Sequence, residues 1–129
     1  MHVKCDWKKL ATEVVSSLSP AEREASIVYL EQRVISPEED LSWAEITRNI
    51  DKPVVIAFVD LEPALNWTHR ARYVVLDTQG TVQQTIDVDR PPFLTGASPD
   101  LCVIHRGDRA PEWAQATTKQ PGNINYTVE

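Results

Sequence analysis

The residues of this sequence with the most versatile chemistry gather in one short segment. Asp60 directly follows an unbroken apolar run, and Glu62 and His69 come soon after it. A carboxylate at the end of a strand and a histidine on the following loop can share a proton, as general acid–base catalysis requires. One hypothesis is therefore a small hydrolase-type enzyme that uses Asp60, Glu62 and His69. In the alternative structural interpretation, Asp60 only ends the strand.

Residue types that bind metals, cofactors or nucleotides do not occur in the required patterns. The sequence has no CxxC pair, no HExxH segment and no Asp-rich loop, which are common metal-binding patterns. Its 4 glycines are scattered, so no glycine-rich phosphate loop is expected. The sequence therefore predicts neither a metal site nor a cofactor.

Charge and composition argue against two classes of partner, nucleic acids and membranes. The 129 residues include 13 Lys and Arg against 19 Asp and Glu, which gives a formal net charge of −6. A protein that binds nucleic acid non-specifically is expected to be basic, so we expect no nucleic-acid partner. No apolar stretch approaches the roughly 18–20 residues of a membrane span, and the N-terminus lacks the apolar run of a signal peptide. We expect a cytoplasmic protein with no membrane partner.

A proline-rich segment over residues 89–100 is a long irregular stretch, and it suggests a binding loop. Its prolines stiffen the backbone and so lower the entropy lost on binding. Phe93 and Leu94 at its centre would form an apolar anchor if exposed, or would close one end of the core if buried. The residues predicted to bind a partner are Trp67, Arg70, Arg90, Phe93 and Leu94.

Hydrophobic periodicity predicts three helices before residue 51. Residues 7–18 repeat apolar side chains at the spacing of one helix face. A capping-box pattern at residues 19–22 predicts a second helix that continues to residue 34, and a similar pattern at 36–39 predicts a third up to residue 50. The inward face of the second helix would carry Ile27, Leu30 and Val34.

The remainder of the sequence predicts strands. Residues 54–59 form an apolar, mostly β-branched run that is typical of a strand buried on both faces. Residues 72–76 and 82–88 predict a hairpin with Gly80 in its turn, and residues 101–104 predict a fourth strand. A short last helix is expected over residues 110–116, begun by Asp108.

This order of elements predicts an α+β fold. Three N-terminal helices would pack on one face of a small, mainly antiparallel sheet of three to four strands, followed by a short C-terminal helix. We expect a single domain over residues 1–129, because a β unit of this length alone would have a marginal core. Within it, residues 7–50 would be the helical part, 51–119 the sheet part and 120–129 a loose tail.

The function that these features favour is binding to a protein. An acidic surface can attract a basic partner, as immunity proteins, antitoxins and secretion chaperones do. We therefore expect a small regulatory protein that binds a protein partner. One expectation is that this partner has a basic surface. Two alternatives stay open: the hydrolase described above, and a helical recruitment module over residues 7–50 carried on a β scaffold.

Overall fold

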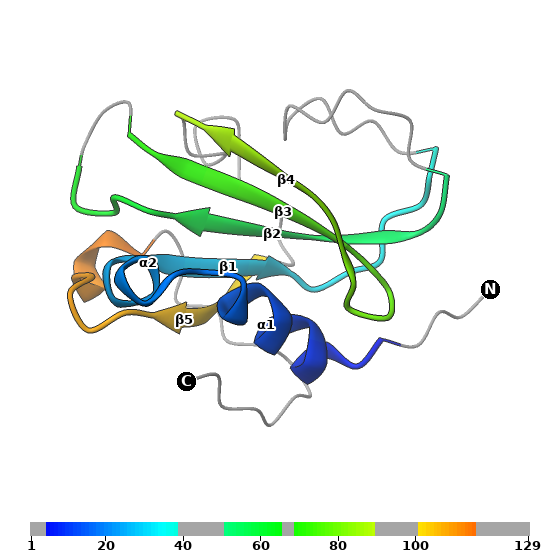
Figure 1. Cartoon of the computed structure of the whole chain (residues 1–129), viewed down its shortest axis with the longest axis horizontal. Coiled ribbons are helices and arrows are strands. Elements are labelled where there is room, and N and C mark those ends of the chain that lie inside the picture. Colours follow the sequence, from blue (N-terminus) through cyan, green and yellow to red (C-terminus); the bar gives the residue numbers. More distant parts are fainter. Residues whose placement is uncertain (1–4, 39–50, 66–68, 90–100, 116–129) are drawn as a thin grey trace.

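The described part of the chain is an antiparallel sheet with helices beside it. The computed structural model describes residues 5–38, 51–65, 69–89 and 101–115. The sheet has the strand order β4-β3-β2-β1-β5, and all neighbouring strands are antiparallel (Figure 1). The strands are β1 (Ile27–Glu31), β2 (Val54–Asp60), β3 (Ala71–Asp77), β4 (Val82–Val88) and β5 (Leu101–Arg106). The helices are α1 (Trp7–Ser16), α2 (Pro20–Ala25) and the 3-10 turn η3 (Glu112–Ala114).

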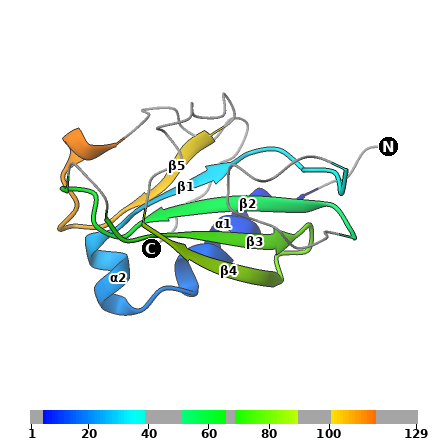
Figure 2. The same ribbon diagram turned by 90° about the horizontal axis from the view of Figure 1, so that it is seen from above.

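Helix α1 packs on one face of the sheet (Figure 2). It begins at Asp6, whose carboxylate accepts a hydrogen bond from the Lys9 N–H at 3.1 Å. Its apolar stripe is buried, so the helix predicted for this stretch is confirmed, and the stripe forms a single cluster with side chains from β1, β2, β3 and β5. The buried helix residues are Leu10, Ala11, Val14 and Val15. Among the described residues, no helix has the length and apolarity needed to span a membrane.

The second helix is shorter than predicted, and the prediction of three N-terminal helices on a sheet of three to four strands is wrong. The capping box that begins α2 is present, with the Glu22 N–H donating to Ser19 Oγ at 3.1 Å and the Ser19 N–H to Glu22 Oε1 at 2.9 Å. The helix ends at Ala25, and the chain continues as β1, which gives the sheet five strands. The third predicted helix falls mostly on residues 39–50, outside the described residues.

The error has a physical cause. Every residue of β1 is buried, because the strand lies between β2 and β5 and is covered on both faces. A strand of this kind shows no alternation of apolar and polar residues. Its continuous apolar run therefore contains residues at helical spacing as well, and periodicity alone cannot separate the two structures.

The second face of the sheet is also buried and carries a row of aromatic side chains. Tyr29, Phe58 and Tyr73 occupy opposite positions on β1, β2 and β3. Their ring centroids lie 6.1 Å and 5.2 Å apart, and each residue is at most 2% exposed. Tilted aromatic pairs at this spacing contribute about 0.5–1.5 kcal/mol beyond their buried area. The row therefore fixes the register of the three strands.

The predicted hairpin is confirmed as β3 and β4. Asp77 ends β3, and its carboxylate accepts the N–H groups of Gln79 and Thr81 at 2.9 Å and 3.0 Å. Gly80 has φ +91° in the turn, a conformation that L side chains rarely adopt. These local contacts explain why the hairpin could be predicted from the turn residues.

The C-terminal helix expected over residues 110–116 is not formed. The chain makes only the turn η3 there, and no side-chain hydrogen bond caps it. Pro111 precedes the turn in an extended conformation. A proline also disfavours a helical conformation for the residue before it, which stops a helix from starting at Asp108. The predicted tail at residues 120–129 lies outside the described residues.

Candidate functional site

Asp60 and His69 meet in the folded chain, although they lie in different segments. Asp60 is the last residue of β2, and His69 lies just before β3. His69 Nε2 is 2.9 Å from Asp60 Oδ1, and the two side chains are only 5% and 8% exposed. The His69 N–H donates to the backbone oxygen of Asp89 at 3.0 Å, which fixes the histidine beside the end of β4. The structure thus brings together two of the three residues named in the hydrolase hypothesis, Asp60 and His69.

Glu62 takes a different position from the one expected of a catalytic carboxylate. Its N–H donates to Asp60 Oδ1 at 3.2 Å, while its carboxylate Oε1 accepts the N–H of Arg70 at 2.7 Å. The carboxylate is thus used to join the two ends of the connection between β2 and β3. The backbone bond from the Leu61 N–H to the Arg70 oxygen, at 3.1 Å, joins the same ends.

The surroundings of Asp60 favour its neutral form. Burial raises the pKa of Asp60 above its ordinary value, and His69 and the Glu62 N–H offset this only in part. A buried carboxylic acid in contact with an imidazole can exchange a proton with it, which is the chemical capability of this pair. Among the described residues, there is no group of three or more His, Cys, Asp or Glu side chains that could hold a metal ion.

Most of the predicted partner-binding residues cannot be placed. Trp67, Arg90, Phe93 and Leu94 lie outside the described residues. Arg70 is described and exposed, and it directly follows His69 in the sequence. The connection that carries it also carries Leu65, which is 51% exposed.

One exposed aromatic residue of the described chain was not among the predicted binding residues. Trp113 on η3 is 72% exposed, although it was expected within a C-terminal helix. Figures 1 and 2 both place η3 and the segment after β2 at the same end of the sheet. We refer to Leu65, Arg70 and Trp113 as the end surface. The sequence signal against a helix here was Pro111, since a proline disfavours a helical conformation for the residue before it.

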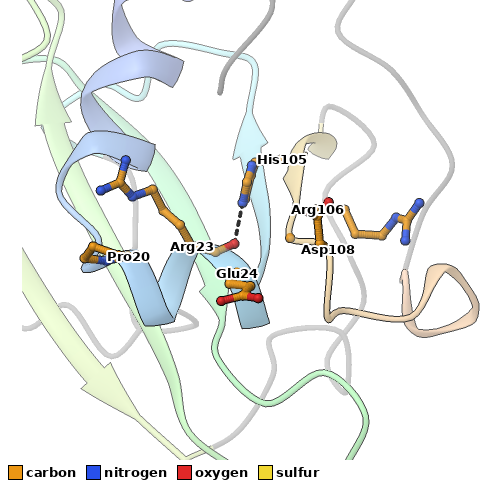
Figure 3. Close-up of a pocket in the computed structure, with 7 residues that line it drawn as sticks. Pro20, Arg23, Glu24, His105, Arg106 and Asp108 are labelled. Atoms are coloured by element: carbon orange, nitrogen blue, oxygen red, sulfur yellow. Dashed lines mark hydrogen bonds between the residues drawn. The ribbon is translucent and has the colours of Figure 1, made fainter.

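A pocket opens near this end, between α2 and the turn that follows β5 (Figure 3). It has a volume of about 560 Å³. His105 Nε2 lies 2.7 Å from the backbone oxygen of Arg23, so one ring nitrogen is already engaged. The guanidinium groups of Arg23 and Arg106 point in opposite directions, as Figure 3 shows. These two guanidinium groups therefore do not converge on a common ligand position in the pocket.

Comparison with protein-family models, curated proteins and solved structures found no match to this chain.

Proposed function

We propose that this chain is a small cytoplasmic regulatory protein that binds a protein partner through the end surface. The observation that carries the proposal is the exposure of Trp113, at 72%, with Leu65 at 51% on a segment at the same end of the sheet. Large apolar side chains leave water favourably when a partner covers them. Tryptophan is also among the residues that contribute most to protein–protein binding.

The surroundings of these two residues fit an interface with an apolar centre and a polar rim. Arg70 supplies an exposed guanidinium within the end surface. Arg109, which precedes η3, forms an ion pair with Glu24 of α2 at 3.2 Å, and both side chains are at least half exposed. The net charge of −6 supports attraction of a basic partner over longer distances, an effect that salt would weaken.

The experiment compares partner capture by the wild type and by variants of the end surface. Tagged protein is incubated at low salt with an extract of the cells that express it, and bound proteins are quantified. Leu65→Ser and Trp113→Ala should each reduce recovery of a stoichiometric partner, with Trp113→Ala weakening binding by about 2 kcal/mol or more, roughly thirtyfold. Val82→Ala is the matched control, because Val82 is an exposed apolar residue (37%) on the hairpin.

Failure of the wild type to recover a stoichiometric partner would contradict the proposal. Equal recovery by the wild type and Trp113→Ala would contradict the assignment of the end surface. Loss of recovery with Val82→Ala alone would place the interface on the hairpin instead.

A second candidate function is acid–base catalysis, which the 2.9 Å contact between Asp60 and His69 favours. The wild type would then hydrolyse members of a panel of activated esters and phosphate esters. His69→Gln and Asp60→Asn, each shown by circular dichroism to be folded, should lower the rate by about a hundredfold or more. No turnover by the wild type, or equal turnover by both folded variants, would dismiss this candidate.

A further inference from the structure

Strand β4 is an open edge of the described sheet. It pairs with β3 on one side, and none of the described strands lies on its other side. Its side chains alternate: Thr85 and Asp87 are exposed, whereas Gln84, Ile86 and Val88 are half-buried. Such an edge presents a row of backbone donors and acceptors to which another strand can bind.

The hydrogen-bond pattern shows which residues of β4 direct their backbone groups outward. The Leu61 N–H donates to the Arg70 oxygen, so residue 70 and every second residue after it face β2. The alternate residues of β3 face β4, and they pair with Gln84, Ile86 and Val88. The N–H and C=O groups of Thr85 and Asp87 therefore point away from the sheet.

This edge lacks most of the features that prevent strand addition. From Val82 to Val88 it contains no proline, lysine or arginine. The negative charge of Asp87 is matched by Arg72, whose Nε donates to Asp87 Oδ1 at 2.8 Å. The one irregularity is a register shift that leaves Gln83 without an opposite residue on β3. Within the described part of the chain, the outward backbone groups of Thr85 and Asp87 are thus available to another strand.

We propose that β4 pairs antiparallel with β4 of a second copy of this chain, around a two-fold axis at Ile86. In this register Thr85 of each copy lies opposite Asp87 of the other, and each pair exchanges both of its N–H···O bonds. The Thr85 hydroxyl can donate to the opposite carboxylate. The two half-buried Ile86 side chains meet at the axis and cover each other.

The side chains of the edge favour this register, and the pairing of Thr85 with Asp87 makes the strand complementary to a second copy of itself. A shift of two residues in one direction would place Asp87 opposite Asp87, which like-charge repulsion disfavours. A shift in the other direction would use Gln83, where the strand is irregular. The register centred on Ile86 is the one in which each Thr85 lies opposite an Asp87 of the other copy and no two like charges face each other.

The test measures molar mass against concentration for the wild type and two variants of Thr85. The molar mass of the wild type should rise from the monomer value of 14.6 kDa toward twice that value as the protein concentration increases from low micromolar to millimolar. Thr85→Pro removes the outward N–H without breaking a bond to β3, so it should raise the dimer dissociation constant by about tenfold or more. Thr85→Ala keeps the N–H and loses only the hydroxyl contact, so it should weaken the dimer less than Thr85→Pro does.

Amide exchange of the wild type gives a second, mutation-free measurement. The amides of Thr85 and Asp87 should exchange quickly at low concentration and become protected as the dimer forms. A wild type that stays monomeric at millimolar concentration would overturn the proposal, as would equal dimerisation by Thr85→Pro. Protection of these amides only in a captured complex with another protein would assign the edge to that partner and also overturn the proposal. The end surface plays no part in this test, so its outcome is independent of the proposed function.

Discussion

Gly107→Ala should strongly destabilise the protein, because there is no room for a side chain at this position. Gly107 follows β5 and lies directly against the C-terminal end of α2. An added Cβ would come within 2.1 Å of the Glu24 backbone oxygen and 2.2 Å of the Arg23 backbone oxygen. Both neighbours are backbone atoms, so a change of side-chain rotamer cannot relieve the contact.

The loss in free energy of unfolding follows from the close contact itself and from the hydrogen bonds that hold this turn against α2. The Gly107 N–H donates to the Ser26 oxygen at 2.9 Å, and the Arg109 N–H donates to the Glu24 oxygen at 2.9 Å. Separating the turn from α2 by the necessary ångström or more weakens both bonds. Overpacking of about 1–3 kcal/mol and about 0.5–1.5 kcal/mol for each of the two bonds together give a loss of about 2–6 kcal/mol.

Urea unfolding followed by circular dichroism measures this loss. With a slope of about 2 kcal/mol per molar urea, the midpoint should fall by about 1–3 M. Asp108→Ala should change it little, because Asp108 is exposed beside the turn and does not cap η3. Gly80→Ala should cost about 1 kcal/mol from its positive φ alone, since its added Cβ would find neighbours at ordinary distances of 3.5 Å. A Gly107→Ala variant with an unchanged midpoint would refute the close packing of β5 and α2.

Four further measurements test individual contacts. Leu10→Ala should lower the free energy of unfolding by about 2–5 kcal/mol, because Leu10 is 1% exposed in the cluster beneath α1; a loss below about 1 kcal/mol in urea unfolding would contradict that packing. Ser19→Ala should cost about 1 kcal/mol in the same assay through loss of the α2 cap, and no loss would mean that the cap is not formed. The Ser19 N–H, and then Arg72, hold the pKa of Glu22 below its ordinary value. Glu22 therefore stabilises the fold at neutral pH and loses this effect as the pH falls below about 4.5. Glu22→Gln should accordingly make the free energy of unfolding less dependent on pH in the acid range. Burial raises the pKa of Asp60, so the stability of the wild type relative to Asp60→Asn should fall as the pH rises through that raised pKa. If the relative stability of the wild type rises with pH instead, the fold favours the ionised form of Asp60.

The features that could be predicted from the sequence depend on residues close together in the chain. The capping box at Ser19 and Glu22, the turn at Gly80 and the amphipathic stripe of α1 each involve neighbours within a few residues. The meeting of Asp60 and His69 follows from the same locality, because adjacent strands of an antiparallel sheet bring the two ends of their connection together.

The features that could not be predicted depend on distant partners. Whether residues after Ala25 continue a helix or form β1 is decided by pairing with β2 and β5, which lie far along the chain. Tyr29 illustrates this, because it pairs with Phe58 on one side and Val103 on the other. Likewise, the turn at Gly107 packs against the end of α2, which lies far away in the chain, and no local pattern reports that packing.

Site-specific photo-crosslinking in the cells that express the chain tests the proposed binding function most directly. A photoreactive phenylalanine analogue replaces Trp113 in one variant and Val82 in a control variant, since both residues are exposed and apolar. We predict that light converts the position-113 variant into a discrete heavier adduct with another protein, while the position-82 variant gives no such adduct. If position 113 yields no adduct, or both positions yield the same one, the end surface is not where this protein meets its partner.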